Sequence, residues 1–137
     1  TTPLPTATAT GTPSGLSVTK FVLINADTNV PVAGFDPILP GAVISYSSIG
    51  TTNINIRAVT NPGVVGSVRF LLDGYGFSLE NVAPYAMAGD LNNGTDYKPF
   101  VPSLSVGQHT IRAIPYSGGS ASGTQGVYAE VTFTINN

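Results

Sequence analysis

The feature that most restricts how this chain can fold is a series of short runs in which apolar side chains recur at every second position. Gly, Pro or Asn separates most runs from the next. Because successive side chains of a strand point to opposite faces, this period of two predicts strands with one inward apolar row. The longer runs are residues 21–24, 54–59, 68–73, 110–114 and 131–135, and shorter strands are expected at 42–47, 75–80 and 85–88.

The alternation also assigns side chains to the two faces of each strand. Phe21 and Leu23 belong to an inward row, with Val22 and Ile24 on the opposite face, and Asn55 falls on the outward row of its strand. No window keeps the apolar spacing of a helix, and no repeat of the size of a propeller blade is present. Seven or more short strands with turn signals between them predict an all-β, antiparallel two-sheet sandwich.

The first fifteen residues differ from the rest of the chain. Residues 1–15 contain six Thr and three Pro, no charge, and Leu4 as the one large apolar side chain. Such a tract cannot bury enough apolar surface to fold alone, so its composition predicts a linker or an extended segment. We therefore expect a Thr/Pro segment at 1–15 and one sandwich domain at 16–137.

Composition limits the function classes and the compartment. Charged residues make up only 9% of the 137 residues, the net charge is −2, and Cys is absent. Five scattered Lys and Arg cannot follow a phosphate backbone, no apolar run is long enough to cross a bilayer, and thiolate chemistry is excluded. No nucleic-acid partner and no membrane span are expected. The richness in Thr, Ser, Asn and Gly favours a secreted or cell-surface protein, and the missing initiating Met suggests a processed chain.

Several segments together resemble bacterial immunoglobulin-like modules. They include Phe21–Thr28, Asn53–Asn61, Gly66–Gly74, Ala83–Tyr85, Gly107–Ala113 and Val127–Ile135. The resemblance covers about residues 16–137 and implies an immunoglobulin-like fold. Modules of that family serve as spacers, adhesive units or companions of glycan-active domains in secreted proteins, so the resemblance implies no reaction.

His109 is the one position where the chain departs from that family in an informative way. Many such modules carry there a Tyr whose hydroxyl ties a corner to the backbone. A ring nitrogen of His109 can replace that hydroxyl as a donor. His109 is also the single His of the chain, and no nucleophile elbow or phosphate loop accompanies it. The seven carboxylates show no spacing that suggests a catalytic pair. The chain is therefore predicted not to be an enzyme, and no cofactor is expected.

Calcium is an alternative to that expectation of no cofactor. Asp90, Asn92 and Asp96 place oxygen donors around a glycine turn, as hard cations prefer. The segment lacks the helices and the twelfth-position Glu of an EF-hand, so the competing interpretation is a solvated turn in which Asn93-Gly94 supplies positive φ. Asn93 also begins a glycosylation sequon, which predicts that it is exposed.

Two groups of side chains are candidates for binding at the surface. Tyr97, Phe100 and Tyr116 lie near predicted turns and could bind a polysaccharide, although rings near turns often seal the ends of a core. Arg69 and Arg112, with Asp73 close by, could form a docking patch, or a solvated sheet face with weak ion pairs.

The alternating segment Thr6, Ala7, Thr8, Ala9 and Thr10 suits an extended strand lying in a shallow groove. Pairing with the open sheet edge of another copy would satisfy a row of backbone groups and join subunits head-to-tail. The leading hypothesis is therefore a non-catalytic extracellular structural or adhesive protein, a surface-filament subunit assembled by N-terminal strand addition. The alternatives are a carbohydrate-binding module of a secreted glycan-active protein and a plain spacer.

Overall fold

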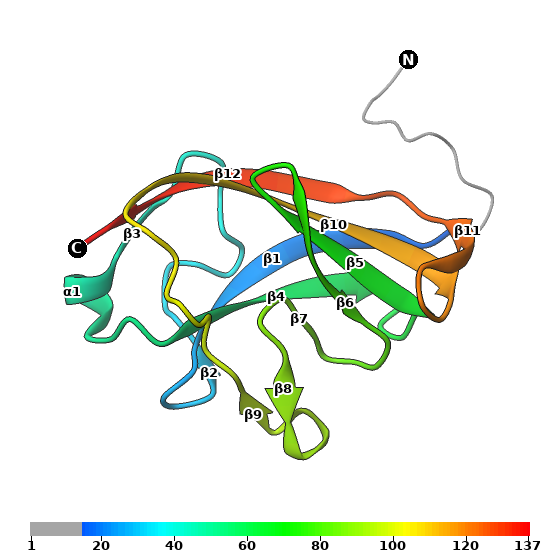
Figure 1. Cartoon of the computed structure of the whole chain (residues 1–137), viewed down its shortest axis with the longest axis horizontal. Helices are drawn as coiled ribbons and strands as arrows, with labels where there is room; N and C mark the ends of the chain where they lie inside the picture. The colour runs from blue at the N-terminus through cyan, green and yellow to red at the C-terminus, as the bar shows by residue number, and fades with distance from the viewer. Residues whose placement is uncertain (1–14) are drawn as a thin grey trace.

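The computed structural model describes residues 15–137 as two β-sheets packed face to face (Figure 1). One sheet has the order β2-β1-β4-β7, with β1 at Ser17–Asn25, β2 at Val30–Pro31, β4 at Ile54–Asn61 and β7 at Tyr85–Ala86. Its neighbouring strands are all antiparallel. The Thr6–Thr10 segment and residues 1–14 as a whole lie outside the described residues, so the predicted division at residue 15 stays a prediction.

The second sheet has the order β3-β12-β10-β5-β6, and β11 pairs with β10 beside it. Its strands are β3 at Val43–Ser45, β5 at Ser67–Leu72, β6 at Tyr75–Glu80, β10 at Gly107–Gly118, β11 at Ser122–Gln125 and β12 at Ala129–Asn136. All pairs are antiparallel except β3 with β12. This is the predicted immunoglobulin-like sandwich, and the fold class is confirmed.

A single core fills the space between the sheets. Fully buried Leu23, Ile56, Phe70, Ile111 and Phe133 come from five different strands of both sheets. Their alternation in sequence gives each strand one apolar face, and burying both faces against each other removes that surface from water. The inward rows predicted for these strands are therefore confirmed.

Two predicted strand ranges are wrong in part. The expected strand at 42–47 ends at Ser45 because the chain turns into the short helix α1 at Tyr46–Ile49. The Ser45 hydroxyl accepts a hydrogen bond from the Ser48 N–H, and Gly50, at φ 90°, ends the helix in the left-handed region. The expected strand at 85–88 stops at Ala86, where the chain begins to leave the sheet.

An excursion of the chain, residues 88–99, is here called the arm. It contains β8 at Asp90–Leu91, the 3₁₀ turn at Asn92–Gly94, and β9 at Asp96–Tyr97. The chain runs along β4 just before and just after it, since Met87 N–H donates to Ile56 O and Phe100 N–H donates to Ile54 O. The arm therefore projects from the edge of the first sheet (Figure 1).

The polypeptide enters and leaves the sandwich at opposite poles. Leu16 lies beside Val127, since Val127 N–H donates to Leu16 O at 2.9 Å and Val18 N–H donates to Val127 O at 3.0 Å. Asn137 lies at the other end of the long axis, next to α1 (Figure 1). There its carbonyl oxygen accepts hydrogen bonds from the Ser45 and Ser47 hydroxyls.

Candidate functional site

The base of the arm is fixed by one buried amide. The side chain of Asn55, which is fully buried, donates to Gly89 O at 2.9 Å and to Lys98 O at 2.7 Å. Its oxygen accepts from the Ala88 N–H at 2.9 Å. The prediction that Asn55 faces solvent is wrong, because the arm covers this face of β4. Val22 and Ile24 were likewise expected on an outward row and are buried.

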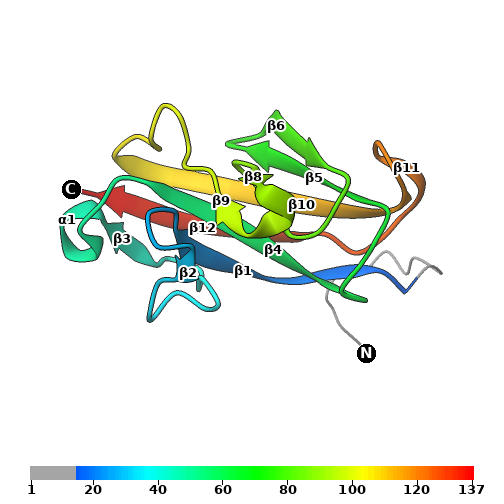
Figure 2. The same cartoon turned by 90° about the horizontal axis from the view of Figure 1, so that it is seen from below.

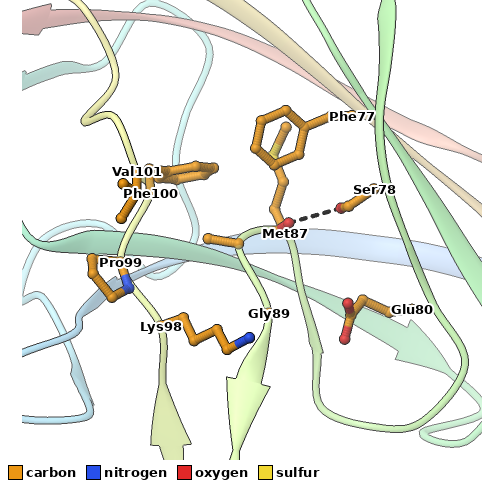
Figure 3. A pocket seen from close by; sticks show the side chains of 10 residues that line it. Phe77, Ser78, Glu80, Met87, Gly89, Lys98, Pro99, Phe100 and Val101 are labelled. Carbon is orange, nitrogen blue, oxygen red and sulfur yellow. Dashed lines mark hydrogen bonds between the residues drawn. The ribbon is translucent and has the colours of Figure 1, made fainter.

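A cleft of about 460 Å³ opens between the base of the arm and strand β6 (Figure 3). Its apolar wall includes Phe77 and Phe100, whose rings meet edge-to-face with centroids 5.6 Å apart, and the fully buried Met87. The Ser78 hydroxyl, also in the lining, donates to Met87 O at 2.7 Å and so ties the two sheets together here. We call this hollow the edge cleft.

Charged groups surround the mouth of the edge cleft. The Glu80 carboxyl and the Lys98 ammonium point toward one another across it (Figure 3), and Asp90 on the arm is hydrogen-bonded to Glu80. Burial raises the pKa of Glu80 to about 7, the Asp90 carboxyl adds to the rise, and Lys98 opposes it. The spacing in the sequence did not suggest this pair, whose two residues lie ten positions apart and are brought together by the turn after β6 and by the arm.

This carboxyl pair does not have the geometry of a glycosidase. Two catalytic carboxyl groups stand about 5–10 Å apart, so that a sugar carbon, with or without a water, fits between them. The Asp90 carboxyl instead contacts Glu80 through a side-chain hydrogen bond that helps to raise the Glu80 pKa. Their arrangement can fasten the arm to β6.

Strand β6 forms an open edge beside the cleft. Outside its pairing with β5, none of its backbone groups is hydrogen-bonded to backbone anywhere in residues 15–137. Three of its apolar side chains are exposed, namely Tyr75 at 79%, Phe77 at 43% and Leu79 at 37%. An edge of this kind is a template on which another strand can pair.

His109 forms the corner that was predicted for it. Its Nε2–H donates to the Ser105 carbonyl four residues upstream at 2.7 Å, and its Nδ1 lies 2.8 Å from the Asp73 carboxylate. Desolvation acts to raise the pKa of Asp73, but the hydrogen bonds from the Thr110 N–H and from His109 outweigh it and lower that pKa. The corner therefore joins the start of β10 to the β5–β6 turn.

The residue types of a Ser-His-Asp triad thus meet in space, although nothing in the spacing of these residues predicted it. The Ser105 hydroxyl lies 3.4 Å from His109 Nε2. A general base must accept that hydroxyl proton, but this nitrogen already donates to the Ser105 carbonyl. The ring is used as a structural donor.

The three candidate calcium ligands make different contacts in the arm. Asp96 accepts hydrogen bonds from the amides of Asn92 and Asn29, while the Asp90 carboxyl is engaged with Glu80. Within residues 15–137 no group of three or more His, Cys, Asp or Glu side chains could hold a metal ion. Asn93 is exposed and has a φ of 57°, and Gly94 has a φ of 86°, as the turn interpretation requires.

The candidate glycan-binding rings do not form a common platform. Phe100 is 2% exposed and packs against Phe77, whereas Tyr97 lies on the arm and is partly exposed. Tyr116 belongs to a different sheet, at the end of β10 that pairs with Ser67 and Gln125. Polysaccharide binding by these residues stays a prediction without a shared surface to support it.

Arg69 and Arg112 lie on the adjacent strands β5 and β10, as expected. Arg112 stacks over the Tyr128 ring at 4.2 Å and forms an ion pair with Glu130 at 2.8 Å. Asp73 faces His109. The pairing of Arg112 is therefore that of a solvated sheet face rather than of an open cationic patch.

Sequence reasoning missed Glu80, Lys98 and Phe77 as parts of one site. The strand at 75–80 was predicted with its correct ends, and its three exposed apolar residues were visible in the sequence. A period of two cannot tell an edge strand from a central one, since edge position depends on which strands pair.

No family model matches this chain, and no curated protein matches it. Among solved structures, it is similar to the fibronectin(III)-like modules of Clostridium thermocellum CbhA, with 20% identity and a TM-score of 0.45. That alignment covers 72% of this chain and 92% of the other. In the described part of the chain, no helix has the length and apolar character needed to span a membrane.

Proposed function

We propose that this chain is a non-catalytic extracellular structural module, and that copies of it assemble head-to-tail by N-terminal strand addition. The observation that carries the proposal is the position of the chain ends. The start of β1 and the C-terminus lie at opposite ends of the long axis (Figures 1 and 2). A module built in this way continues the polypeptide along a line, which suits a fibre or a spacer.

Two clusters of side chains have the residue types of catalytic sites, namely Glu80 with Asp90 and His109 with Ser105 and Asp73. The contacts within both clusters support a structural role. The Glu80–Asp90 pair is closed by its own hydrogen bond, and the His109 ring holds a corner. The Glu80 carboxyl is engaged with Asp90, and the His109 nitrogen that faces Ser105 already donates to a carbonyl, so we assign both groups a structural role.

Strand addition explains how separate copies would join. Leu16 lies at one pole of the sandwich, beside Val127, and the Thr6–Thr10 segment that precedes it in the sequence alternates small and β-branched residues. When such a segment pairs with the next copy, the contact is head-to-tail and generates a filament unless the rotation closes a ring.

The test compares the full chain with residues 15–137 by sedimentation and electron microscopy. We expect concentration-dependent assembly of the full chain and none of the truncated one. Thr8→Pro should also abolish assembly, because Pro removes a backbone donor, whereas Thr8→Val keeps the β-branched shape and should assemble normally.

If the full chain stays monomeric at high concentration, the self-assembly part of the proposal is wrong. The alternative function as a spacer then remains, because the opposite positions of the two chain ends support it equally. Turnover of an ester or glycoside substrate that is lost in His109→Phe or Glu80→Gln would overturn the non-catalytic part of the proposal.

A further inference from the structure

We propose that β6 is the acceptor edge, and that it pairs with Thr6–Thr10 of a second copy of this chain. The inference rests on the proposed strand addition and names the surface that receives the strand. Within residues 15–137, four strands lie at the ends of the two main sheets, and β6, with six residues, is the longest of them. β2 and β7 have two residues each, and β3 has three.

The residues of β6 lack the features that usually protect an edge strand from pairing. Proteins usually protect such edges with Lys, Pro, short strands or a covering loop. β6 has no Lys and no Pro, and its single charged residue, Glu80, is its last and turns toward the cleft. Tyr75, Phe77 and Leu79 instead expose apolar surface along the strand.

The edge cleft explains why the occupant should carry small, uncharged side chains. A strand added to β6 would place every second side chain on the inner face, where the cleft already contains Phe77 and Phe100. Thr6–Thr10 offers only Thr and Ala there, so no large group has to fit. The absence of charge also avoids an unpaired ion beside the Glu80–Asp90 pair and Lys98.

The length of the linking segment favours a second copy over the chain's own β6. Leu16 lies beside Val127, just before β12, and a strand added outside β6 would be four strand spacings from β12. Four spacings are about 19 Å, and the stretch from Thr10 to Leu16 spans at most about 20 Å when fully extended. Folding back would leave almost no chain for the turn, whereas a neighbouring copy imposes no such limit.

The absence of Cys from the sequence allows a direct test by disulfide formation. Chains with Thr8→Cys and chains with Leu79→Cys, one of them isotope-labelled, are mixed under oxidising conditions, and mixed dimers are measured by mass spectrometry. The matched controls pair Thr8→Cys with Val30→Cys on β2 or with Val43→Cys on β3, which are also exposed edge positions. We expect at least ten-fold more mixed dimer with Leu79→Cys than with either control.

A second measurement uses charge to block the edge without a cross-link. Leu79→Lys places an ammonium group on β6 and should weaken self-association at least ten-fold. Leu39→Lys, at an exposed site outside the strands, should leave it unchanged. Melting curves check that both variants stay folded.

The outcomes separate this inference from the proposed function. Assembly that depends on residues 1–14 but links preferentially to Val30→Cys or Val43→Cys would keep strand addition and overturn β6 as its acceptor. A chain carrying both Thr8→Cys and Leu79→Cys that closes on itself as a monomer would overturn the second copy as donor. If the full chain does not assemble at all, both the proposed assembly and this inference are wrong.

Discussion

At the scale of single residues, Asn55 shows how one buried amide can position two loop ends. Its side chain reaches Gly89 and Lys98, which lie 34 and 43 residues further along the chain. A buried polar group is tolerated only when its hydrogen bonds are made, and here both its N–H groups and its oxygen are used. The edge cleft depends on this residue, because the base of the arm forms one of its walls.

We expect Asn55→Ala to lower the free energy of unfolding by about 2–4 kcal/mol, since it removes the side-chain hydrogen bonds to Gly89 O, Lys98 O and the Ala88 N–H. Urea unfolding followed by tyrosine fluorescence measures the change. Asn53→Ala is the control, because Asn53 donates to Asp27 at the exposed surface and its loss should cost about 0.5 kcal/mol. Equal effects of the two substitutions would contradict the anchoring role.

The raised pKa of Glu80 predicts that the free energy of unfolding depends on pH. Its pKa is about 7 in the folded chain and 4.5 ordinarily, so the folded state holds the proton more tightly. This contribution is complete below about pH 4.5 and is lost as pH rises through 7, by at most about 3 kcal/mol. Glu80→Gln should therefore flatten the decline in stability between pH 5 and 8, as guanidinium titrations at several pH values can show.

The control for that experiment is Glu130→Gln, which removes a carboxylate from the exposed Arg112 ion pair. Its pH profile should follow that of the unmodified chain. If Glu80→Gln also keeps the unmodified slope, the protonation of Glu80 does not stabilise the fold.

At the scale of elements, the attachment of β1 to the start of β12 requires a residue without a side chain. A Cβ at Gly126 would lie 2.5 Å from the Leu16 carbonyl oxygen, closer than atoms can approach. We expect Gly126→Ala to destabilise the chain by about 1–3 kcal/mol and to weaken protection of the Val18 and Val127 amides in hydrogen exchange.

Gly63→Ala provides the comparison for this substitution. Gly63 has no atom within 4 Å of an added Cβ and is not in the left-handed region, so the change should be within about 0.5 kcal/mol of neutral. A neutral result at Gly126 would mean that the Leu16–Val127 contact moves aside at little cost.

The strands could be predicted from sequence because their alternation is local information. β6 has the predicted ends, and the cores of β1, β4, β5, β10 and β12 fall on predicted runs. The arm could not be predicted, since residues 88–99 have no periodic pattern. The burial of Asn55 and Ile24 was missed for a related reason, because Asn55 is covered by that distant segment.

The candidate site was predictable only in its parts. Glu80, Asp90 and Lys98 are separated in sequence, and what brings them together is the turn after β6 and the return of the arm. His109 was predicted as a corner donor because the modules that the chain resembles carry a Tyr donor at that position, and this was confirmed. Its partners Asp73 and Ser105 were not anticipated.

At the scale of the whole molecule, one core closes both sheets with side chains from residues 18–135. We therefore expect removal of residues 1–14 to change the melting temperature of the dilute protein by less than about 2 °C, which corresponds to well under 1 kcal/mol for a chain of this size. Calorimetry at low concentration tests this. A large drop would mean that the tract stabilises the sandwich of its own chain.

The placement of the two chain ends has a mechanical consequence. The start of β1 and the segment just before β12 meet in parallel at the Ser17–Val127 bridge, and β12 runs from that pole toward the C-terminus. Tension applied through the ends would pull these two strands in opposite directions along their length, so their hydrogen bonds would be sheared together instead of opening one after another like a zip. Resistance to stretching is therefore a property that this topology provides without any additional cross-link.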